Sequence, residues 1–332
     1  MNELIRLFKI IVAIFGFVLI LISVTLLLHY NPSVFEKSMT EATIIEQVKK
    51  SPYWQAPDIK TLSLDKAGDH IRYGRDLIVR TSYYLGPNGT VSNSSNGMNC
   101  QNCHLNAGTK PFGNNYGSVA SLYPKFRPRS GKLESIEKRV NDCIERSLNG
   151  KALDSLSNEM QAMVAYIKWL GKDVPKGEKA QGSGFAEIKW LDRPADSTSG
   201  RKLYIQKCVI CHGLKGEGQK ISAEGFYVYP PLWGENSFNT GAGLFRISNF
   251  SRYILVNMPY GSSNASPILT DEEAWDIAAY VLSLPRPVGN FKKDWPKIEL
   301  KPADHPFGPY ADKFTERQHK FGPFKEMGIS LK

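Results

Sequence analysis

Two pentapeptides of the form Cys-x-x-Cys-His carry the chemistry that this sequence shows most directly. They are Cys100–His104 and Cys208–His212. Two thiols three residues apart can form thioethers to one porphyrin, and the histidine that follows reaches the iron. A zinc half-site or a redox dithiol does not need histidine directly after the second cysteine. The sequence therefore predicts two covalently bound haem c groups, attached through Cys100, Cys103, Cys208 and Cys211, with His104 and His212 as proximal iron ligands.

The second axial ligand differs between the two predicted haems. Met258 lies in a loop after the second haem motif, where a thioether ligand would raise the reduction potential. The alternative is that Met258 only packs against the porphyrin edge. The first haem has no equivalent methionine, because Met98 lies too close to Cys100 to cross the porphyrin plane, and Met160 and Met163 are expected in a hydrophobic core.

Cys143 remains after the other four cysteines are assigned to thioethers. It lies beside a stripe of apolar residues that predicts a helix from Leu133 to Gly150. Arg139, Cys143 and Ser147 are spaced by four and share one face of that helix, where the guanidinium favours the thiolate. One interpretation is a small buried residue. The other, which an unpaired cysteine in an oxidising compartment favours, is a thiolate bound to the first iron or a sulfur nucleophile beside it.

The elements around the two haem motifs repeat. An early helix precedes each motif and an amphipathic helix follows it, at residues 160–170 and 275–284. We therefore expect an all-α fold with two cytochrome c-like haem domains joined by a linker. The expected organisation is an N-terminal transmembrane helix at 1–30, a stalk at 31–65, a first domain with the catalytic haem at 66–172, a linker at 173–198, a second domain with the electron-transfer haem at 199–286 and a C-terminal tail at 287–332, lying over the domains or partly mobile.

The N-terminal segment resembles an uncleaved signal-anchor. Arg6 and Lys9 precede an apolar run from Ile10 to Leu28, and no Ala-x-Ala-like cleavage site follows it. As a helix this run spans about 28 Å, close to the roughly 30 Å hydrocarbon core of a bilayer. The positive-inside rule then places the haem domains on the periplasmic side of a bacterial inner membrane. The net charge of +10 indicates either an anionic partner or simply a solvated basic surface, and no Lys/Arg run is dense enough to predict nucleic acid.

Several segments resemble a known family. The segment Arg139–Gly150 resembles the active-site helix of the dihaem thiosulfate dehydrogenases, some of which run in reverse as tetrathionate reductases. Residues 102–109 resemble the first haem loop of that family, and residues 229–234 and 237–243 resemble its second-domain loop. The resemblance covers about residues 60 to 290.

The resemblance implies an enzyme that joins two thiosulfates into tetrathionate at a first haem with His and Cys ligands. Carried over, Cys143 is both iron ligand and sulfur-handling residue, leaving the iron reversibly during turnover. Arg139 and Ser147 help to bind the sulfur oxyanion, and Arg129 is a further candidate. Some members place a lysine before the second-domain methionine, whereas this chain has Asn257. The expected ligand pairs are therefore His104 with Cys143 and His212 with Met258.

Two alternatives remain at this point. One is a c4-like dihaem electron carrier delivering electrons to a terminal oxidase, which needs methionine at both irons and no substrate cations. The other is a subunit resembling the Cys-ligated sulfur-oxidation cytochromes, which work as heteromers. The enzyme also needs an electron-transfer partner, either a cytochrome c or a membrane quinol/oxidase system, and the sequence leaves the dominant direction of reaction open.

Overall fold

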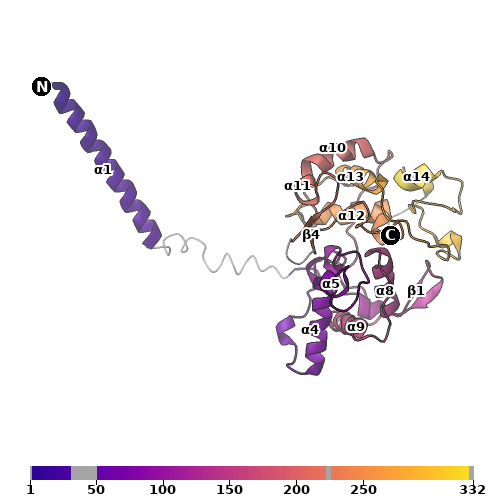
Figure 1. Ribbon diagram of the computed structural model, residues 1–332. Helices are drawn as coiled ribbons and strands as arrows, with labels where there is room; N and C mark the ends of the chain where they lie inside the picture. The colour runs from indigo at the N-terminus through magenta and orange to yellow at the C-terminus, as the bar shows by residue number, and fades with distance from the viewer. Residues whose placement is uncertain (1, 31–50, 222–225, 329–332) are drawn as a thin grey trace. The chain divides into compact units, whose positions relative to one another are not determined.

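The computed structural model describes residues 2–30, 51–221 and 226–328 (Figure 1). The chain divides into two compact units, Met1–Pro52 and Tyr53–Lys332. The first unit contains helix α1 (Asn2–Tyr30), which exposes apolar side chains such as Phe15, Phe17 and Ile20. Across the described residues, we find no helix with the length and hydropathy that a membrane crossing requires. A helix at the predicted anchor is thus present, while the predicted transmembrane character is not shown. Most of the predicted stalk lies outside the described residues.

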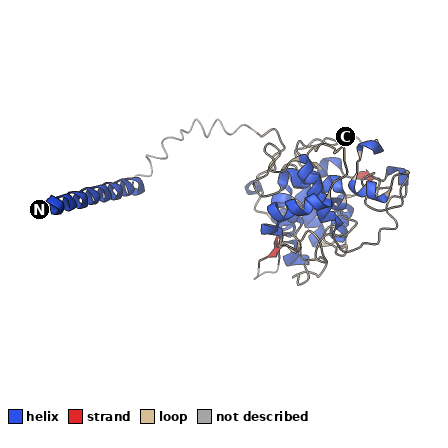
Figure 2. Ribbon diagram, turned by 90° about the horizontal axis from the view of Figure 1, so that it is seen from above, coloured by secondary structure: helices blue, strands red, loops and turns tan. Residues whose placement is uncertain are grey.

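The second unit is mainly helical, and its strands form two short antiparallel hairpins (Figure 2). The helices around the first haem motif are α4 (Lys66–Val79), α5 (Thr81–Leu85), α6 (Leu105–Gly108), α7 (Val119–Leu122), α8 (Ile136–Arg146) and α9 (Asn158–Leu170). Those that follow are α10 (Ser197–Lys207), α11 (Val209–His212), α12 (Ile247–Asn257), α13 (Asp271–Ser283) and α14 (Glu316–Phe321). The hairpins pair β1 (Lys125–Arg127) with β2 (Lys132–Glu134) and β3 (Gln219–Lys220) with β4 (Tyr227–Tyr229).

The same helix pair recurs in both halves of this unit. Helix α4 packs against α9, and α10 packs against α13. A Cβ atom added at Gly74 would lie 1.9 Å from the carbonyl oxygen of Ala162, and one at Gly200 would lie 1.8 Å from that of Asp276. Only glycine allows the two backbones to approach so closely. The predicted internal repeat therefore appears in space as two equivalent helix crossings.

The hydrophobic core consists of two clusters, and partly buried residues such as Val140 and Leu153 pack against both of them. Met160 and Met163 are fully buried in the core of the first half, as predicted. Ile144 and Leu148, by contrast, belong to the core cluster that contains α12 and α13. The C-terminal end of α8 is therefore buried against the second half, and the two predicted haem domains form one compact unit. The predicted linker also packs tightly, with Trp190 stacked on Trp275 at 5.3 Å between ring centroids.

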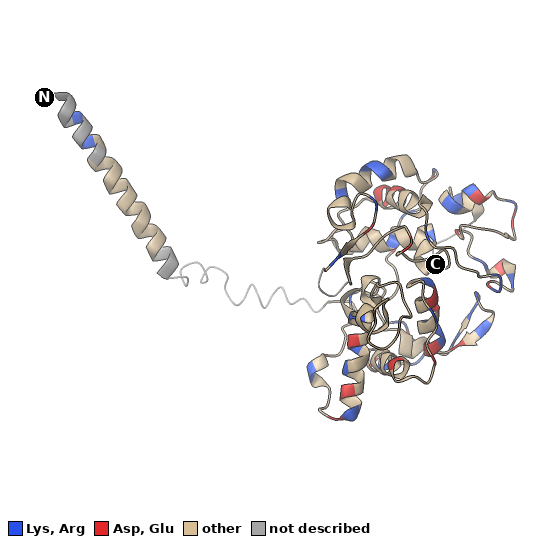
Figure 3. Ribbon diagram, in the orientation of Figure 1, with Lys and Arg blue, Asp and Glu red and all other residues tan. Residues whose placement is uncertain are grey.

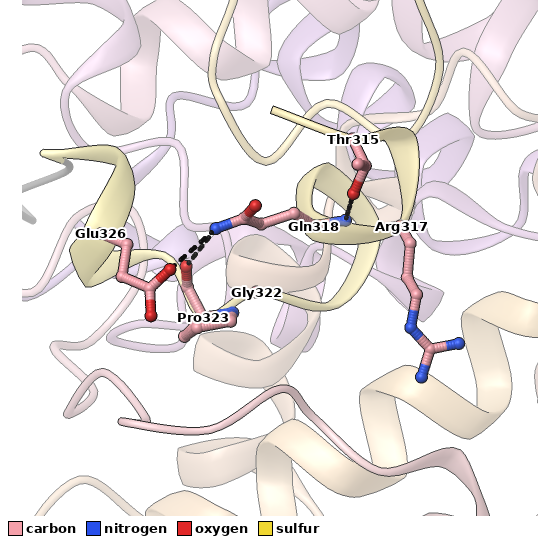
Figure 4. A pocket seen from close by; sticks show the side chains of 6 residues that line it. All are labelled: Thr315, Arg317, Gln318, Gly322, Pro323 and Glu326. Atoms are coloured by element: carbon pink, nitrogen blue, oxygen red, sulfur yellow. Dashed lines mark hydrogen bonds between the residues drawn. The ribbon is translucent and has the colours of Figure 1, made fainter. Parts of the chain in front are cut away.

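The described part of the C-terminal tail packs against the linker and the second half. Phe324 packs against the Trp190–Trp275 pair, and Asp304 pairs with Arg246. Near α14, a shallow hollow is lined by Thr315, Arg317, Gln318, Gly322, Pro323 and Glu326 (Figure 4). Its central Gln318 side chain is already bonded within the segment, to Pro323 and Glu326. This hollow is therefore a feature of tail packing rather than a site.

Candidate active site at the first haem motif

The two proximal histidines are oriented in the same way. The Nδ1 atom of His104 lies 2.6 Å from the carbonyl oxygen of Asn114, and that of His212 lies 2.9 Å from the carbonyl oxygen of Pro230. Because a carbonyl can only accept, each Nδ1 carries the proton and each Nε2 keeps a free lone pair. Such a bond to a backbone carbonyl orients histidines that ligate metals. The residues present therefore fit iron ligation by Nε2 at both motifs.

The cysteines of the first motif are also placed for haem attachment. None of the chain's five cysteines, all within the described residues, forms a disulfide. Burial, with a smaller contribution from nearby Cys143, raises the pKa of Cys103 to about 12. Burial likewise raises the pKa of Cys100 to about 11. Both thiols are thus partly buried near Cys143, in a setting suited to a porphyrin. At the second motif, burial raises the pKa of Cys208 to about 11.

Helix α8 carries Cys143 and is shorter than the sequence predicted. Ser135 caps its N-terminus by accepting a hydrogen bond from the backbone N–H of Lys138. The predicted start at Leu133 is wrong, because Leu133 lies in β2 opposite Phe126 and is 68% exposed. The helix ends at Arg146, so Ser147 is its C-cap and donates its backbone N–H to the carbonyl of Cys143 at 2.8 Å. Asn149, with φ of 44°, rather than Gly150 takes the left-handed turn after the helix.

Arg139 and Cys143 interact as their spacing predicted. The Cys143 thiol is partly buried, and burial raises its pKa. The Arg139 guanidinium and the nearby His104 together outweigh burial and lower the pKa of Cys143 to about 7. The thiolate of Cys143 in turn raises the pKa of Arg139. The structure therefore brings Arg139, Cys143 and His104 together, in an arrangement that favours a sulfur anion beside the first haem motif.

Arg129 reaches the same region from the turn between β1 and β2. Its Nη1 donates to the carbonyl oxygen of Gly241 at 2.8 Å. The pKa of Arg129 is lowered to about 10, mainly by burial and to a smaller extent by repulsion from Arg146 and Arg139. Basic residues also lie along the β1–β2 hairpin itself (Figure 3). The site therefore gathers several guanidinium groups in partly buried surroundings, which suits an oxyanion.

The remaining site residues are less closely tied to this cluster. Ser147 is placed at the end of α8 by its backbone, one turn from Cys143. Met258 is the C-cap residue of α12, where it is partly buried against the core that also contacts Cys208. Nothing in the described residues tests their roles, or the assigned ligand pairs, directly. These assignments stay predictions.

The sequence did not single out three further residues at the site. Tyr123 is buried, and Arg139 and Cys143 both influence its pKa, which burial raises. Arg146 and Asp294 form a bidentate ion pair that joins α8 to the C-terminal segment. Arg146 lies within the segment that carried the family resemblance, so it could have been noticed. No sequence signal indicated that residue 294 would reach α8.

Comparisons with known proteins agree with this geometry. The family profile described as "SoxA/TsdA, cytochrome c domain" matches residues 90–175, and the profile described as "Cytochrome c" matches residues 197–285. The thiosulfate dehydrogenase of Psychrobacter arcticus is 41% identical over 74% of this chain and 72% of its own length. That of Allochromatium vinosum is 39% identical over 64% of this chain and 79% of its own. The chain belongs to the thiosulfate dehydrogenase family.

A solved structure supports the assignment to the thiosulfate dehydrogenase family. The thiosulfate dehydrogenase TsdBA from Marichromatium purpuratum superposes with a TM-score of 0.66 at 28% identity, covering 71% of this chain and 50% of that one. This chain thus spans half the length of that protein. As a family member with two cytochrome c domains, the protein is an oxidoreductase that carries two covalently bound haem c groups.

Proposed function

We propose that this protein interconverts thiosulfate and tetrathionate at its first haem motif. Two thiosulfate dianions lose one electron each, and a new S–S bond joins them into tetrathionate; the reverse reaction takes up two electrons and breaks that bond. The observation that carries the proposal is that Cys143 lies near enough to Arg139 and His104 for both to lower its pKa, at the first haem motif that contains Cys100 and Cys103. The named activity of the curated relatives supports it.

The roles of the residues follow from their charges. Arg139 favours the anionic form of Cys143 and attracts the sulfonate-like end of the substrate. Arg129 supplies a second, partly buried guanidinium, and Ser147 adds a hydroxyl at the end of the same helix. Cationic groups in a partly buried site bind a dianion more strongly than they would in water. Thiosulfate and tetrathionate are therefore small anionic substrates that these residues can hold and orient.

When bound, the two haem groups supply irons that each accept or release one electron at a time. We propose that His104 and Cys143 hold the first iron and that His212 and Met258 hold the second. The Nδ1–H bonds of both histidines to carbonyl groups support this assignment. A thiolate at one centre and a thioether at the other would give the two irons different potentials.

Electrons would leave through the surface around the second haem motif. Ile210, between the two cysteines, is 84% exposed, and Leu214 and Tyr260 are 64% and 95% exposed. Exposed apolar side chains of this kind suit a transient electron-transfer partner. We propose a cytochrome c or a membrane quinol/oxidase system as that partner.

We also propose that α1 attaches the protein to a bacterial inner membrane with the haem domains on the periplasmic side. Arg6 and Lys9, followed by exposed apolar side chains along the helix, support the attachment. The test is fractionation of cells expressing the full chain and a variant lacking residues 1–30 behind a cleavable export signal. Release of the shortened variant alone into the periplasmic fraction is the expected result. Equal distribution of both proteins contradicts the attachment.

The activity is tested with the purified dihaem protein. It is assayed with thiosulfate and an artificial electron acceptor, and with tetrathionate and a reductant. Arg139→Lys and Cys143→Gly are compared with Arg193→Lys, a matched control whose arginine pairs with Asp276 in the second half. We expect activity in the wild type and the control, and a large loss in both site variants.

Each outcome separates the proposal from its alternative. Absence of wild-type activity in both directions overturns the enzyme function. Full activity of Cys143→Gly removes Cys143 from the mechanism. Spectra showing methionine ligation at both haems would instead favour the c4-like electron carrier delivering electrons to a terminal oxidase.

A further inference from the structure

The C-terminal segment that follows α13 contacts the catalytic half of the protein. It leaves the second haem domain along the loop before η3 (Gly243–Phe245), where Thr240 donates its backbone N–H to the carbonyl of Pro287. Phe291 packs so closely against Gly241 and Gly289 that an added Cβ would lie 2.2 Å and 2.0 Å from its ring. This path brings the next residues to α8.

Asp294 is the residue of this segment that binds α8. Its two carboxylate oxygens accept hydrogen bonds from Nη1 and Nη2 of Arg146 at 2.8 Å and 3.0 Å. Both side chains are largely buried, at 16% and 11% exposed. The guanidinium of Arg146 also lies over the ring of Phe291, with 4.2 Å to its centroid. A bidentate pair in such surroundings holds both partners in one orientation.

The same carboxylate lies beside Arg129. The Nε atom of Arg129 is 3.9 Å from Oδ2 of Asp294. The neighbouring Trp295 donates its backbone N–H to the carbonyl of Arg129 at 2.7 Å, and the Arg129 guanidinium lies 5.5 Å from the Trp295 ring centroid. Trp295 adopts φ of 61°, a left-handed conformation that is costly for an aromatic residue and persists only where surrounding contacts impose it.

Charge explains why an acidic residue is needed at this point. Arg129 experiences repulsion from Arg146, Arg139 and Arg127, and Asp294 is the carboxylate that counters it. Arg146 also has Oδ1 of Asp142 at 3.7 Å from its Nε, whereas Arg129 pairs with Asp294. Without Asp294, the partly buried guanidinium of Arg129 would turn away from the other cations and towards solvent. Arg129 would then lose the orientation in which it faces the Cys143 helix.

We propose that Asp294 is a positioning residue of the substrate site, which holds Arg129 and Arg146 in place for oxyanion binding. The proposal rests on the proposed function for its substrate. It makes the C-terminal segment, which lies beyond both family-profile matches, part of the active site. The effect acts through the arginines, because Asp294 itself repels an anion.

The test compares Asp294→Asn with the wild type in steady-state thiosulfate oxidation by the purified dihaem protein. We expect the KM for thiosulfate to rise about tenfold, as for one misplaced charge-assisted hydrogen bond, with a smaller change in kcat. Asp294→Glu keeps the charge and should recover much of the loss. Asp276→Asn is the matched control, because Asp276 forms a similar bidentate pair with Arg193 in the second half, and its KM should be unchanged.

Calorimetric titration with inorganic sulfate provides a readout that does not depend on turnover. Asp294→Asn should bind sulfate about tenfold more weakly than the wild type, and Asp276→Asn should bind it equally well. Removing a carboxylate without any positioning effect would tighten anion binding, since the local positive charge increases. An unchanged or lower KM together with unchanged or tighter sulfate binding overturns the proposal. Wild-type protein that binds sulfate but neither oxidises thiosulfate nor reduces tetrathionate refutes the proposed function. The sulfate comparison then remains as the test of Asp294.

Discussion

The close crossing of α10 and α13 predicts a large effect of one added methyl group. In Gly200→Ala the new Cβ would lie 1.8 Å from the carbonyl oxygen of Asp276. Ordinary contact between carbon and oxygen needs about 3.3 Å, so the helices must separate by roughly 1.5 Å. The opposing atom belongs to the backbone and cannot rotate away. Overpacking costs about 1–3 kcal/mol, and we expect the upper end of that range.

Alanine returns part of this cost because it favours helix over glycine by about 1 kcal/mol. The net loss in the free energy of unfolding is then about 2 kcal/mol, which lowers Tm by about 3 °C in a unit that runs from Tyr53 to Lys332. Gly74→Ala should behave alike, since its Cβ would lie 1.9 Å from the carbonyl oxygen of Ala162. The assay is thermal unfolding of the dihaem protein, followed by far-UV circular dichroism.

Gly243→Ala is the control for this experiment, because no atom lies within 4 Å of a Cβ built at that glycine. Its Tm should stay within about 1 °C of the wild type, as for most substitutions away from the core. A Gly200→Ala protein as stable as the Gly243→Ala control would refute the argument that the close crossing of backbones requires glycine.

Three further predictions concern the active site and the C-terminal segment. Arg139→Gln should lower kcat/KM for thiosulfate about thirtyfold, because it removes a charge-assisted contact with the substrate. Lys138→Gln on the same helix is the control, and its kcat/KM should stay within about twofold of the wild type. Equal effects of the two substitutions would contradict a specific role of Arg139. Burial lowers the pKa of His305 from 6.5 to about 3, so the folded state favours the neutral imidazole and the free energy of unfolding falls as pH drops below 6.5, by about 2 kcal/mol at pH 5. Denaturant titrations at several pH values should show that this pH dependence vanishes in His305→Phe. Its persistence in that variant would be evidence against the assignment. Burial raises the pKa of Asp304, but Arg246 and the hydrogen bonds from Ser248 together outweigh burial and lower it below 3.8. Asp304→Asn should therefore destabilise the protein at pH 7, and the difference from wild type should shrink as pH falls below 3.8. A difference independent of pH would disprove the contribution of these contacts to the Asp304 carboxylate.

Local sequence patterns determined much of the site. The haem motifs, the helical spacing of Arg139 and Cys143, and the repeated helices each depend on residues within a few turns of one another. The capping box that Thr270 and Glu273 form at the start of α13 likewise depends only on residues three apart. The start of α8 was misjudged because Leu133 continues the apolar stripe in sequence, while its pairing with Phe126 places it in a strand. Secondary-structure pattern alone could not distinguish these two environments.

By itself, the sequence determined two haem attachment sites, an unpaired Cys143 and the arginine one turn before it, because these features are encoded in short segments. Only the tertiary structure decided that Arg129 approaches the Cys143 helix, and that Asp294 joins Arg146 across 148 residues of chain. It also decided that the two halves share a core through Ile144 and Leu148. Contacts of this kind depend on how the chain folds back over α8, and no local propensity or spacing records that path.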